Sequence, residues 1–203
     1  MPLRLQAKVA LLGDPCVGKT AIATMFNSAG TLFPKNYKLT SGVDVQRGTV
    51  DVPSDGAGPS SKAPPTVDIY VHDVGGQEVF RDQIFEGAGN AWAKDIDYCV
   101  LVYDVTNKAS FDHLAKWHSQ LKNARDEKER ALHAVLVANK SDLSAHANAE
   151  LSTAKEWAST HGFEFVEVSA LPPGRNIVKP FELIAKKVHT AYQDRLLAVA
   201  EML

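Results

Sequence analysis

An eight-residue loop motif near the start of the chain constrains its fold more than any other feature. Residues 13–20 read Gly-Asp-Pro-Cys-Val-Gly-Lys-Thr and match the pattern G-x-x-x-x-G-K-[ST] at every fixed position. An apolar run precedes the motif and a segment of helical period follows it. A chance match in a chain of this length is expected about once in a hundred. We therefore interpret the motif as a phosphate-binding loop between a strand and a helix.

The loop chemistry assigns roles to its residues. Glycines let successive backbone N–H groups wrap a phosphate at a helix N-terminus, where the helix dipole favours negative charge. We expect Lys19 to reach the β- and γ-phosphates of a nucleotide and the Thr20 hydroxyl to bind Mg²⁺. The candidate nucleotide-binding residues of the loop are Gly13, Asp14, Pro15, Cys16, Val17, Gly18, Lys19 and Thr20.

Apolar runs alternate with segments of helical period along the chain. The sequence predicts strands at Ala7–Leu12, Val43–Val52, Thr66–His72, Tyr98–Tyr103, Ala134–Ala138 and Phe163–Val168. It predicts helices at Lys19–Asn27, Ser110–Arg125, Asn148–His161 and Ile177–Leu197, with Ser110 as an N-cap and Gly162 just after a helix end. This order predicts an α/β domain in which helices cover both faces of a mostly parallel, six-stranded sheet.

One insert interrupts this alternation. Residues 53–65 read PSDGAGPSSKAPP, which is rich in Pro, Gly and Ser and nearly free of large apolar side chains. Such a segment cannot bury a core, so we expect a mobile loop. The sequence shows neither an internal repeat nor a domain boundary, and we expect residues 1–203 to form a single domain.

Composition excludes several classes of partner. The net charge of −2 gives no general attraction to nucleic acid, and no run approaches the roughly 18 apolar residues of a membrane span. The two cysteines, Cys16 and Cys99, are too few for a disulfide framework and favour a reducing compartment. The last residues, LAVAEML, contain no cysteine for prenylation. We expect a soluble, intracellular protein without a direct membrane anchor.

A second motif indicates which base is bound. Asn139-Lys140-Ser141-Asp142 follows a predicted strand, about 120 residues after the phosphate loop. The carboxylate of Asp142 can accept hydrogen bonds from N1–H and the exocyclic amine of guanine. Adenine offers no such donor pair, and a polar group left unpaired is penalised. The motif therefore predicts guanine, with Asn139, Lys140 and Asp142 as binding residues.

These motifs make the chain resemble the Ras-like small GTPases over nearly its whole length. Residues 101–111, LVYDVTNKASF, and the stretch YKLTSGVDV around Thr40 are most similar to the Rab branch. The resemblance implies a small-GTPase fold that binds GTP or GDP with Mg²⁺. It implies that Thr20, Thr40 and Asp73 hold the metal, Asp73 through water. By the same resemblance, the Gly76 N–H contacts the γ-phosphate and Gln77 is catalytic, orienting the attacking water.

The resemblance also assigns further residues at the base. Phe33 is either a stacking partner of guanine or a partly buried anchor of its loop. The family's Ser-Ala-Lys loop corresponds to Ser169-Ala170-Leu171, where the Ala170 N–H can meet the guanine oxygen but the lysine is replaced.

Some positions depart from the Rab pattern. Pro15 lacks an N–H beside the γ-phosphate, which implies slow hydrolysis, and Gly75 replaces an alanine and should loosen the backbone. The segment after Gln77 is about five residues longer than in a typical Rab. Its large apolar residues either pack on the sheet or form a partner surface; they are Phe80, Ile84, Phe85 and Trp92.

Together with the tail that lacks cysteine, these departures resemble the Rab-like subunits of intraflagellar transport complex B. That resemblance implies a small β-sandwich partner subunit, other subunits of the complex, and a location in the cytoplasm, the cilium or flagellum and the basal body. Two alternatives stay open, a nucleotide-binding adaptor with negligible hydrolysis and a non-prenylated Rab of vesicle traffic. A kinase or ATPase is disfavoured by Thr40 and by the motif at 139–142.

Overall fold

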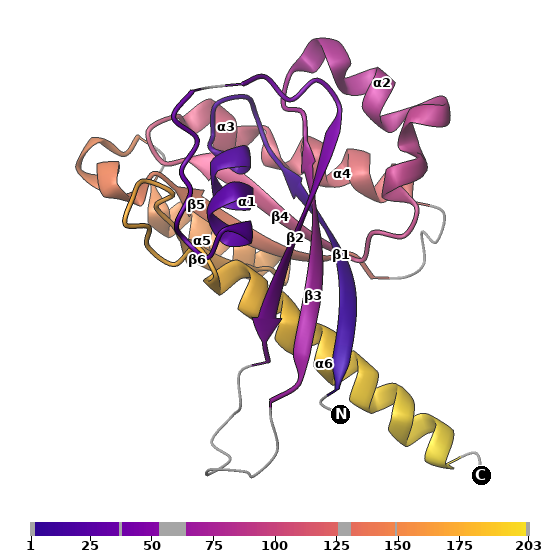
Figure 1. The fold of residues 1–203 in the computed structure, drawn as a ribbon. Helices are drawn as coiled ribbons and strands as arrows, with labels where there is room; N and C mark the ends of the chain where they lie inside the picture. Colours follow the sequence, from indigo (N-terminus) through magenta and orange to yellow (C-terminus); the bar gives the residue numbers. More distant parts are fainter. Residues whose placement is uncertain (1–2, 37, 53–63, 126–130, 149, 202–203) are drawn as a thin grey trace.

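The computed structural model describes residues 3–36, 38–52, 64–125, 131–148 and 150–201. Within these ranges the chain forms one six-stranded sheet (Figure 1). The strands are β1 (Arg4–Leu12), β2 (Val43–Asp51), β3 (Thr66–Val74), β4 (Tyr98–Asp104), β5 (His133–Asn139) and β6 (Glu164–Glu167). Their order across the sheet is β2-β3-β1-β4-β5-β6, and β2 pairs with β3 antiparallel while the other described pairs are parallel. The predicted fold class is confirmed.

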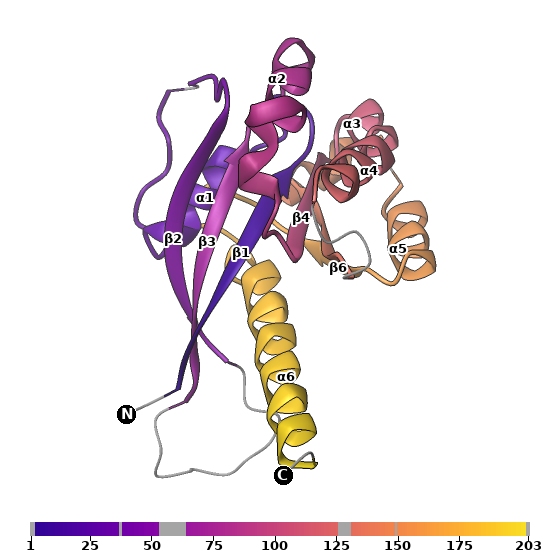
Figure 2. The ribbon, with the colours of Figure 1, turned by 90° about the vertical axis from the view of Figure 1, so that its right-hand side faces the viewer.

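Helices cover both faces of the sheet. The α-helices are α1 (Lys19–Asn27), α2 (Arg81–Phe85), α3 (Lys108–Asp112), α4 (Leu114–Ala124), α5 (Leu151–Thr160) and α6 (Lys179–Glu201). Short 3₁₀ segments are η1 (Glu78–Phe80), η2 (Gly87–Ala93) and η3 (Ser141–His146). Figure 2 shows α3, α4 and α5 grouped on the side away from α1. Because the parallel strands end at one edge, the loops that follow them gather there and can build a common site.

Alternating side chains of the strands belong to two hydrophobic cores, one on each face of the sheet. On one face, Val9 and Leu11 pack with residues of α1 and α6, where the rings of Phe26 and Phe181 stack with centroids 3.8 Å apart. On the other face, Leu12 of β1 packs with residues of α2, α4 and α5. Successive side chains of a strand point to opposite faces, which explains why β1 contributes to both cores.

The helix predicted at Ser110–Arg125 is two helices, and that prediction is wrong in detail. At His113 the backbone tightens (φ −81°, ψ −9°), and this separates α3 from α4. Ser110 is not the N-cap, because it lies inside α3 and Asn107 precedes the helix. The Ser110 hydroxyl instead donates to the Asn107 carbonyl at 2.6 Å. Gly162 follows the end of α5 with a φ of 69°, as predicted.

The lengthened segment after Gln77 packs on the sheet. Ile84 and Phe85 are buried, and the ring of Trp92 meets that of Phe85 edge-on at 5.6 Å. The Trp92 indole N–H donates to the Ile84 carbonyl at 2.9 Å. The structure therefore favours the packing interpretation of these apolar residues over a partner surface.

The C-terminal helix was expected to begin at residue 177 and begins at Lys179. Its buried residues lie in its first half, and its second half extends beyond the sheet (Figure 1). No helix among the described residues is both long and apolar enough to cross a membrane. Most of the predicted loop at 53–65 lies outside the described residues.

Candidate nucleotide site

The phosphate loop joins β1 to α1 in the backbone conformation that its glycines permit. Gly13 has a φ of 146° and Gly18 a φ of 97°, and L side chains rarely adopt either value. A Cβ on Gly13 would lie 2.1 Å from the carbonyl oxygen of Val102 in β4. The loop therefore passes so close to the neighbouring strand that only glycine fits. The loop leads into the N-terminus of α1, where backbone N–H groups and the helix dipole favour the binding of an anion.

Lys19 places a buried ammonium group inside this loop. Its Nζ donates to the carbonyls of Gly13 at 2.8 Å and Asp14 at 2.9 Å, and the residue is 6% exposed. Burial lowers the pKa of Lys19 to about 8, against the opposing effect of Asp73 and Asp14. A ligand with phosphate groups would place a negative charge beside this ammonium and compensate for its burial.

The three residues predicted to hold the metal come together from three segments. The Thr20 hydroxyl donates to Oδ2 of Asp73 at 2.6 Å. The hydroxyl oxygens of Thr20 and Thr40 lie 3.3 Å apart, and Thr40 is 3.5 Å from the same carboxylate oxygen. Burial raises the pKa of Asp73 despite the hydrogen bond from Thr20, and its buried Oδ1 atom has no hydrogen-bond partner among the residues that the structure describes. This oxygen-rich cluster has the chemistry that Mg²⁺ prefers.

We call Gly76 to Arg81 the switch segment, and its first residue lies against the phosphate loop. A Cβ on Gly76 would lie 2.6 Å from the Pro15 nitrogen and 2.8 Å from Nζ of Lys19. Gln77 lines the cavity next to this contact. We expected Gly75 to loosen the backbone, but it is packed tightly, because a Cβ there would lie 2.4 Å from the Thr40 carbonyl oxygen.

The guanine motif is attached to the phosphate loop. Nδ2 of Asn139, a buried residue at the end of β5, donates to the Val17 carbonyl at 2.7 Å. Lys140 has a φ of 61°, and its Nζ lies 2.6 Å from Oδ2 of Asp104. These contacts orient the loop after β5 beside the phosphate loop, as a base-binding loop requires.

The loop after β6 closes the same region. The Ser169 hydroxyl donates to Oδ1 of Asp142, whose side chain is otherwise exposed. Ser169 and Ala170 are buried, whereas Leu171 is 55% exposed. The structure thus brings together Asp142 and the Ser-Ala-Leu loop, which lie far apart in the sequence.

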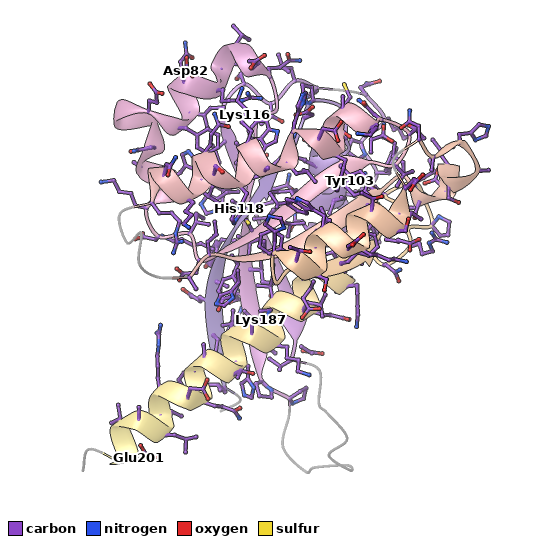
Figure 3. All side chains as sticks on the ribbon, turned by 180° about the vertical axis from the view of Figure 1, so that it is seen from behind. Asp82, Tyr103, Lys116, His118, Lys187 and Glu201 are labelled. Carbon is purple, nitrogen blue, oxygen red and sulfur yellow. The ribbon has the colours of Figure 1, made fainter. Side chains whose placement is uncertain are left out.

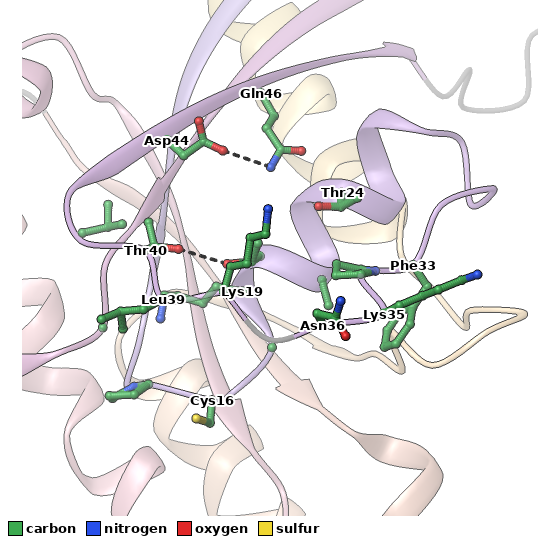
Figure 4. A pocket seen from close by; sticks show the side chains of 18 of the residues that line it. Cys16, Lys19, Thr24, Phe33, Lys35, Asn36, Leu39, Thr40, Asp44 and Gln46 are labelled. Carbon is green, nitrogen blue, oxygen red and sulfur yellow. Dashed lines mark hydrogen bonds between the residues drawn. The ribbon is translucent and has the colours of Figure 1, made fainter.

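A cavity of about 720 Å³ opens beside the phosphate loop (Figure 4). Its walls include Cys16, Lys19, Thr40 and Gln77, and Phe33 contributes from the loop after α1. Phe33 is 37% exposed. It therefore has an open ring face at the cavity, which both interpretations of this residue accommodate. The candidate residues that do not line this cavity are Gly13, Asp14, Val17, Asp73, Asn139, Lys140, Asp142, Ser169, Ala170 and Leu171.

Two residues that contact the phosphate loop were missed in the sequence. Nδ1 of His113 lies 2.7 Å from one oxygen of Asp14, and the indole N–H of Trp117 donates to the other at 2.9 Å. Their positions, between α3 and α4 for His113 and on α4 for Trp117, carry no motif, and His113 resembles an ordinary surface histidine. The sequence feature that could have indicated them is Asp14, because a carboxylate in a phosphate loop needs a hydrogen-bond donor that holds it away from the phosphates.

The fold and this site define a small GTPase, with a phosphate loop, a hydroxyl and carboxylate cluster and a guanine motif along one edge of the sheet. A model of the Ras family matches residues 8–190, and the chain belongs to that family. As a member of the Ras family, it is a guanine-nucleotide-binding protein.

Within the family, several relatives of the chain share one name. It is 36% identical to intraflagellar transport protein 27 of Chlamydomonas reinhardtii over 96% of this chain and 89% of that protein. It is 38% identical to the homologue from Bos taurus over 96% of both chains. The homologue from Trypanosoma brucei brucei is 33% identical over 98% of this chain and 99% of that protein.

Proposed function

We propose that this protein is a Rab-like GTPase subunit of the intraflagellar transport machinery that binds GTP and GDP with Mg²⁺ and hydrolyses GTP slowly. The observation that carries the nucleotide part is the convergence of Lys19, Thr20, Thr40 and Asp73 at the start of α1. The assignment to intraflagellar transport rests on relatives of that name, which match nearly the whole chain at 33–38% identity. By comparison, Rab-7a of Paramecium octaurelia is 31% identical over 92% of this chain.

Three residues would hold the metal. The Thr20 and Thr40 hydroxyls and the Asp73 carboxylate supply oxygen ligands, directly or through water. The buried Oδ1 of Asp73 has no hydrogen-bond partner within the described part of the chain, and a cation would supply an electrostatic partner there. When bound, Mg²⁺ neutralises charge on the β- and γ-phosphates. Lys19 contributes a second positive charge from inside the loop.

The residues at the base supply specificity. Asp142 would accept from two donors of guanine, while its hydrogen bond from Ser169 keeps the carboxylate in place. Asn139 holds the loop against Val17 and so fixes the distance between base and phosphate sites. The Ala170 N–H would meet the guanine oxygen, and the Phe33 ring would stack on the base.

Hydrolysis would depend on the switch segment. Gln77 would orient the attacking water, and the Gly76 N–H would contact the γ-phosphate. Pro15 supports the expectation of a slow rate, because its nitrogen carries no hydrogen and lies against Gly76. The same feature favours the alternative of an adaptor that binds nucleotide and does not turn it over. Single-turnover rates of the wild type and Gln77→Leu separate the two, since an adaptor would give equal rates.

The proposed setting is the cytoplasm, the basal body and the cilium or flagellum. There the protein would pair with a small β-sandwich subunit and with other subunits of complex B. Affinity purification of the chain from a ciliated cell should recover transport subunits. Recovery of vesicle-traffic factors in their place would favour the alternative of a non-prenylated Rab.

The nucleotide assignment is tested by Asp142→Asn. Removing the carboxylate costs hydrogen bonds to a charged acceptor, so GTP affinity should fall by about 100-fold or more. Affinity for xanthosine triphosphate should rise, because its base offers an acceptor where guanine has a donor. Asp194→Asn on the exposed part of α6 is the matched control and should leave both affinities unchanged. An unaltered preference for GTP in Asp142→Asn would contradict the guanine assignment.

A further inference from the structure

The phosphate loop carries a carboxylate close to the site proposed for the phosphates. Asp14 follows Gly13, and its backbone carbonyl accepts a hydrogen bond from Lys19 at 2.9 Å. Its side chain is 14% exposed. A negative charge beside a triphosphate opposes binding unless it is directed away from the phosphates and paired.

Two donors from the junction of α3 and α4 hold that carboxylate. Nδ1 of His113 lies 2.7 Å from Oδ2 of Asp14, and Nε1 of Trp117 lies 2.9 Å from Oδ1. An ionised carboxylate can only accept, so both nitrogens carry the hydrogen of their bond. Trp117 is 1% exposed, which leaves its indole no freedom to follow the carboxylate elsewhere. The direction of the Asp14 charge is therefore set by the start of α4.

The same tryptophan contacts the switch segment. The Arg81 guanidinium lies over the Trp117 ring, 4.5 Å from its centroid, and Arg81 is buried. Nη1 of Arg81 donates to Oε1 of Glu78 at 3.1 Å, and Nζ of Lys116 donates to the same oxygen at 3.2 Å. The hydrogen bond from Lys116 lowers the pKa of Glu78, the residue after Gln77.

One helix thus contacts the phosphate loop and the switch segment at once. In Figure 3 the helix that carries Lys116 and His118 runs beside the segment that carries Asp82. The contacts that join Asp14 to Arg81 through Trp117 are a hydrogen bond and a cation–π contact, both directional. Displacement of Trp117 would therefore disturb both contacts.

We propose that Trp117 is a positioning residue that turns the Asp14 carboxylate away from the phosphates and anchors the switch segment through Arg81. The proposal rests on the nucleotide-binding function proposed above. Through this bridge the phosphate loop and the residues after Gln77 share one anchor on α4. Loss of the indole N–H frees an acidic charge inside the phosphate loop and weakens the hold on nucleotide.

A double-mutant cycle tests the contact between Trp117 and Asp14. Its readout is the release rate of a fluorescent GDP analogue from the full chain. Trp117→Phe keeps an aromatic ring under Arg81 and removes the N–H, and should speed release about tenfold. In an Asp14→Asn background the charge is already gone, so the same change should speed release less than threefold. Equal factors in the two backgrounds would refute the positioning role, because lost packing alone acts regardless of the charge.

The contact between Trp117 and Arg81 is tested with Arg81→Gln. This change should speed release of a GTP analogue about fivefold and of GDP less than twofold, because the switch segment would contact the γ-phosphate. In a Trp117→Leu background, where Arg81 has no aromatic ring to lie over, its effect should shrink, since both substitutions remove the same contact. Full additivity of Arg81→Gln with Trp117→Leu would contradict the bridge.

Control variants distinguish a failure of the bridge from a failure of the proposed nucleotide-binding function. Trp157→Phe on α5, where the ring meets Phe111 and Phe163 in place of Arg81, should release nucleotide at the wild-type rate. His113→Leu removes the other donor at an exposed position and should speed release several-fold, so it replaces Trp117→Phe if that variant fails to fold. A wild type that binds no guanine nucleotide would refute the proposed function. A wild type that binds, with Trp117→Phe and His113→Leu both releasing at its rate, would refute the bridge alone.

Discussion

Replacing Lys19 by methionine should remove a pH-dependent contribution to the stability of the nucleotide-free protein while it abolishes the binding of GTP and GDP. The ammonium group is buried in the phosphate loop, where burial disfavours its charge. Methionine has a similar length and no charge, so it fills the same space without that penalty. Nucleotide binding is lost because the positive charge that would meet the phosphates is gone.

The magnitude follows from the pKa of Lys19. Folding lowers that pKa from its ordinary 10.5 to about 8, which corresponds to about 3 kcal/mol against the charged form. Methionine loses two hydrogen bonds from a charged donor to the carbonyls of Gly13 and Asp14, which together contribute about 3–6 kcal/mol. We therefore expect Lys19→Met to be between equal in stability to the wild type and about 3 kcal/mol less stable at pH 7.

The pH dependence has a definite sign. Between pH 8 and 10.5 the unfolded chain holds a proton on Lys19 that the folded chain releases. The free energy of unfolding therefore rises with pH across this window, and the destabilisation is complete below it. From pH 7 to pH 9 the contribution of Lys19 is a rise of about 1.3 kcal/mol.

Urea unfolding of nucleotide-free wild type and Lys19→Met at pH 7 and pH 9 measures both quantities. Groups other than Lys19 titrate in both proteins, so the difference between the two pH slopes isolates this residue. Equal slopes would refute the reasoning, because they would show that the ammonium is not desolvated in the folded state. A Lys19→Met variant clearly more stable than wild type at pH 7 would show that the burial of charge outweighs the two hydrogen bonds.

Two glycines give further predictions. Gly76→Ala places a Cβ 2.6 Å from the Pro15 nitrogen, so the switch segment must move away from the phosphate loop; the ratio of GTP to GDP affinity, measured by titration, should fall about tenfold or more, and an unchanged ratio would contradict this. Gly48→Ala places a Cβ 2.4 Å from the ring of Phe26, which stacks on Phe181; urea unfolding should show a loss of about 1–3 kcal/mol, and a neutral result would show that the ring can shift freely.

Much of the fold was predictable because hydrophobic period and chain order constrain it strongly. Helix α1 has the predicted bounds, Lys19–Asn27, since the motif fixes where it begins. Strand β4, which is buried along its whole length, appears as a continuous apolar run and was located to within a residue. Strand β1 begins at Arg4, before its predicted start at Ala7, because its first residues are mostly polar and at least partly exposed. The division between α3 and α4 was not predictable, because Ser110 satisfies a helix-start pattern while its hydroxyl bonds the turn before it.

The site was predictable where a motif fixes several residues at once. The meeting of Thr20, Thr40 and Asp73 follows from loops at one sheet edge, and the sequence resemblance named all three. The contacts of His113 and Trp117 with Asp14 span about 100 residues and depend on the angle at which α4 packs. Periodicity assigns Trp117 to the buried face of its helix, but it cannot tell which atom the indole N–H will meet.

The site holds two buried charges of opposite sign, and both are disfavoured by burial. Desolvation lowers the pKa of Lys19 and raises the pKa of Asp73, so each group is short of a partner charge in the folded chain. A bound phosphate group would supply a negative charge to Lys19, and a divalent cation would supply a positive charge to Asp73. A nucleotide bound together with a cation would supply both charges, and the Thr20 hydroxyl already joins the start of α1 to the Asp73 carboxylate. We therefore expect nucleotide and Mg²⁺ to bind with positive cooperativity, each raising the affinity of the site for the other.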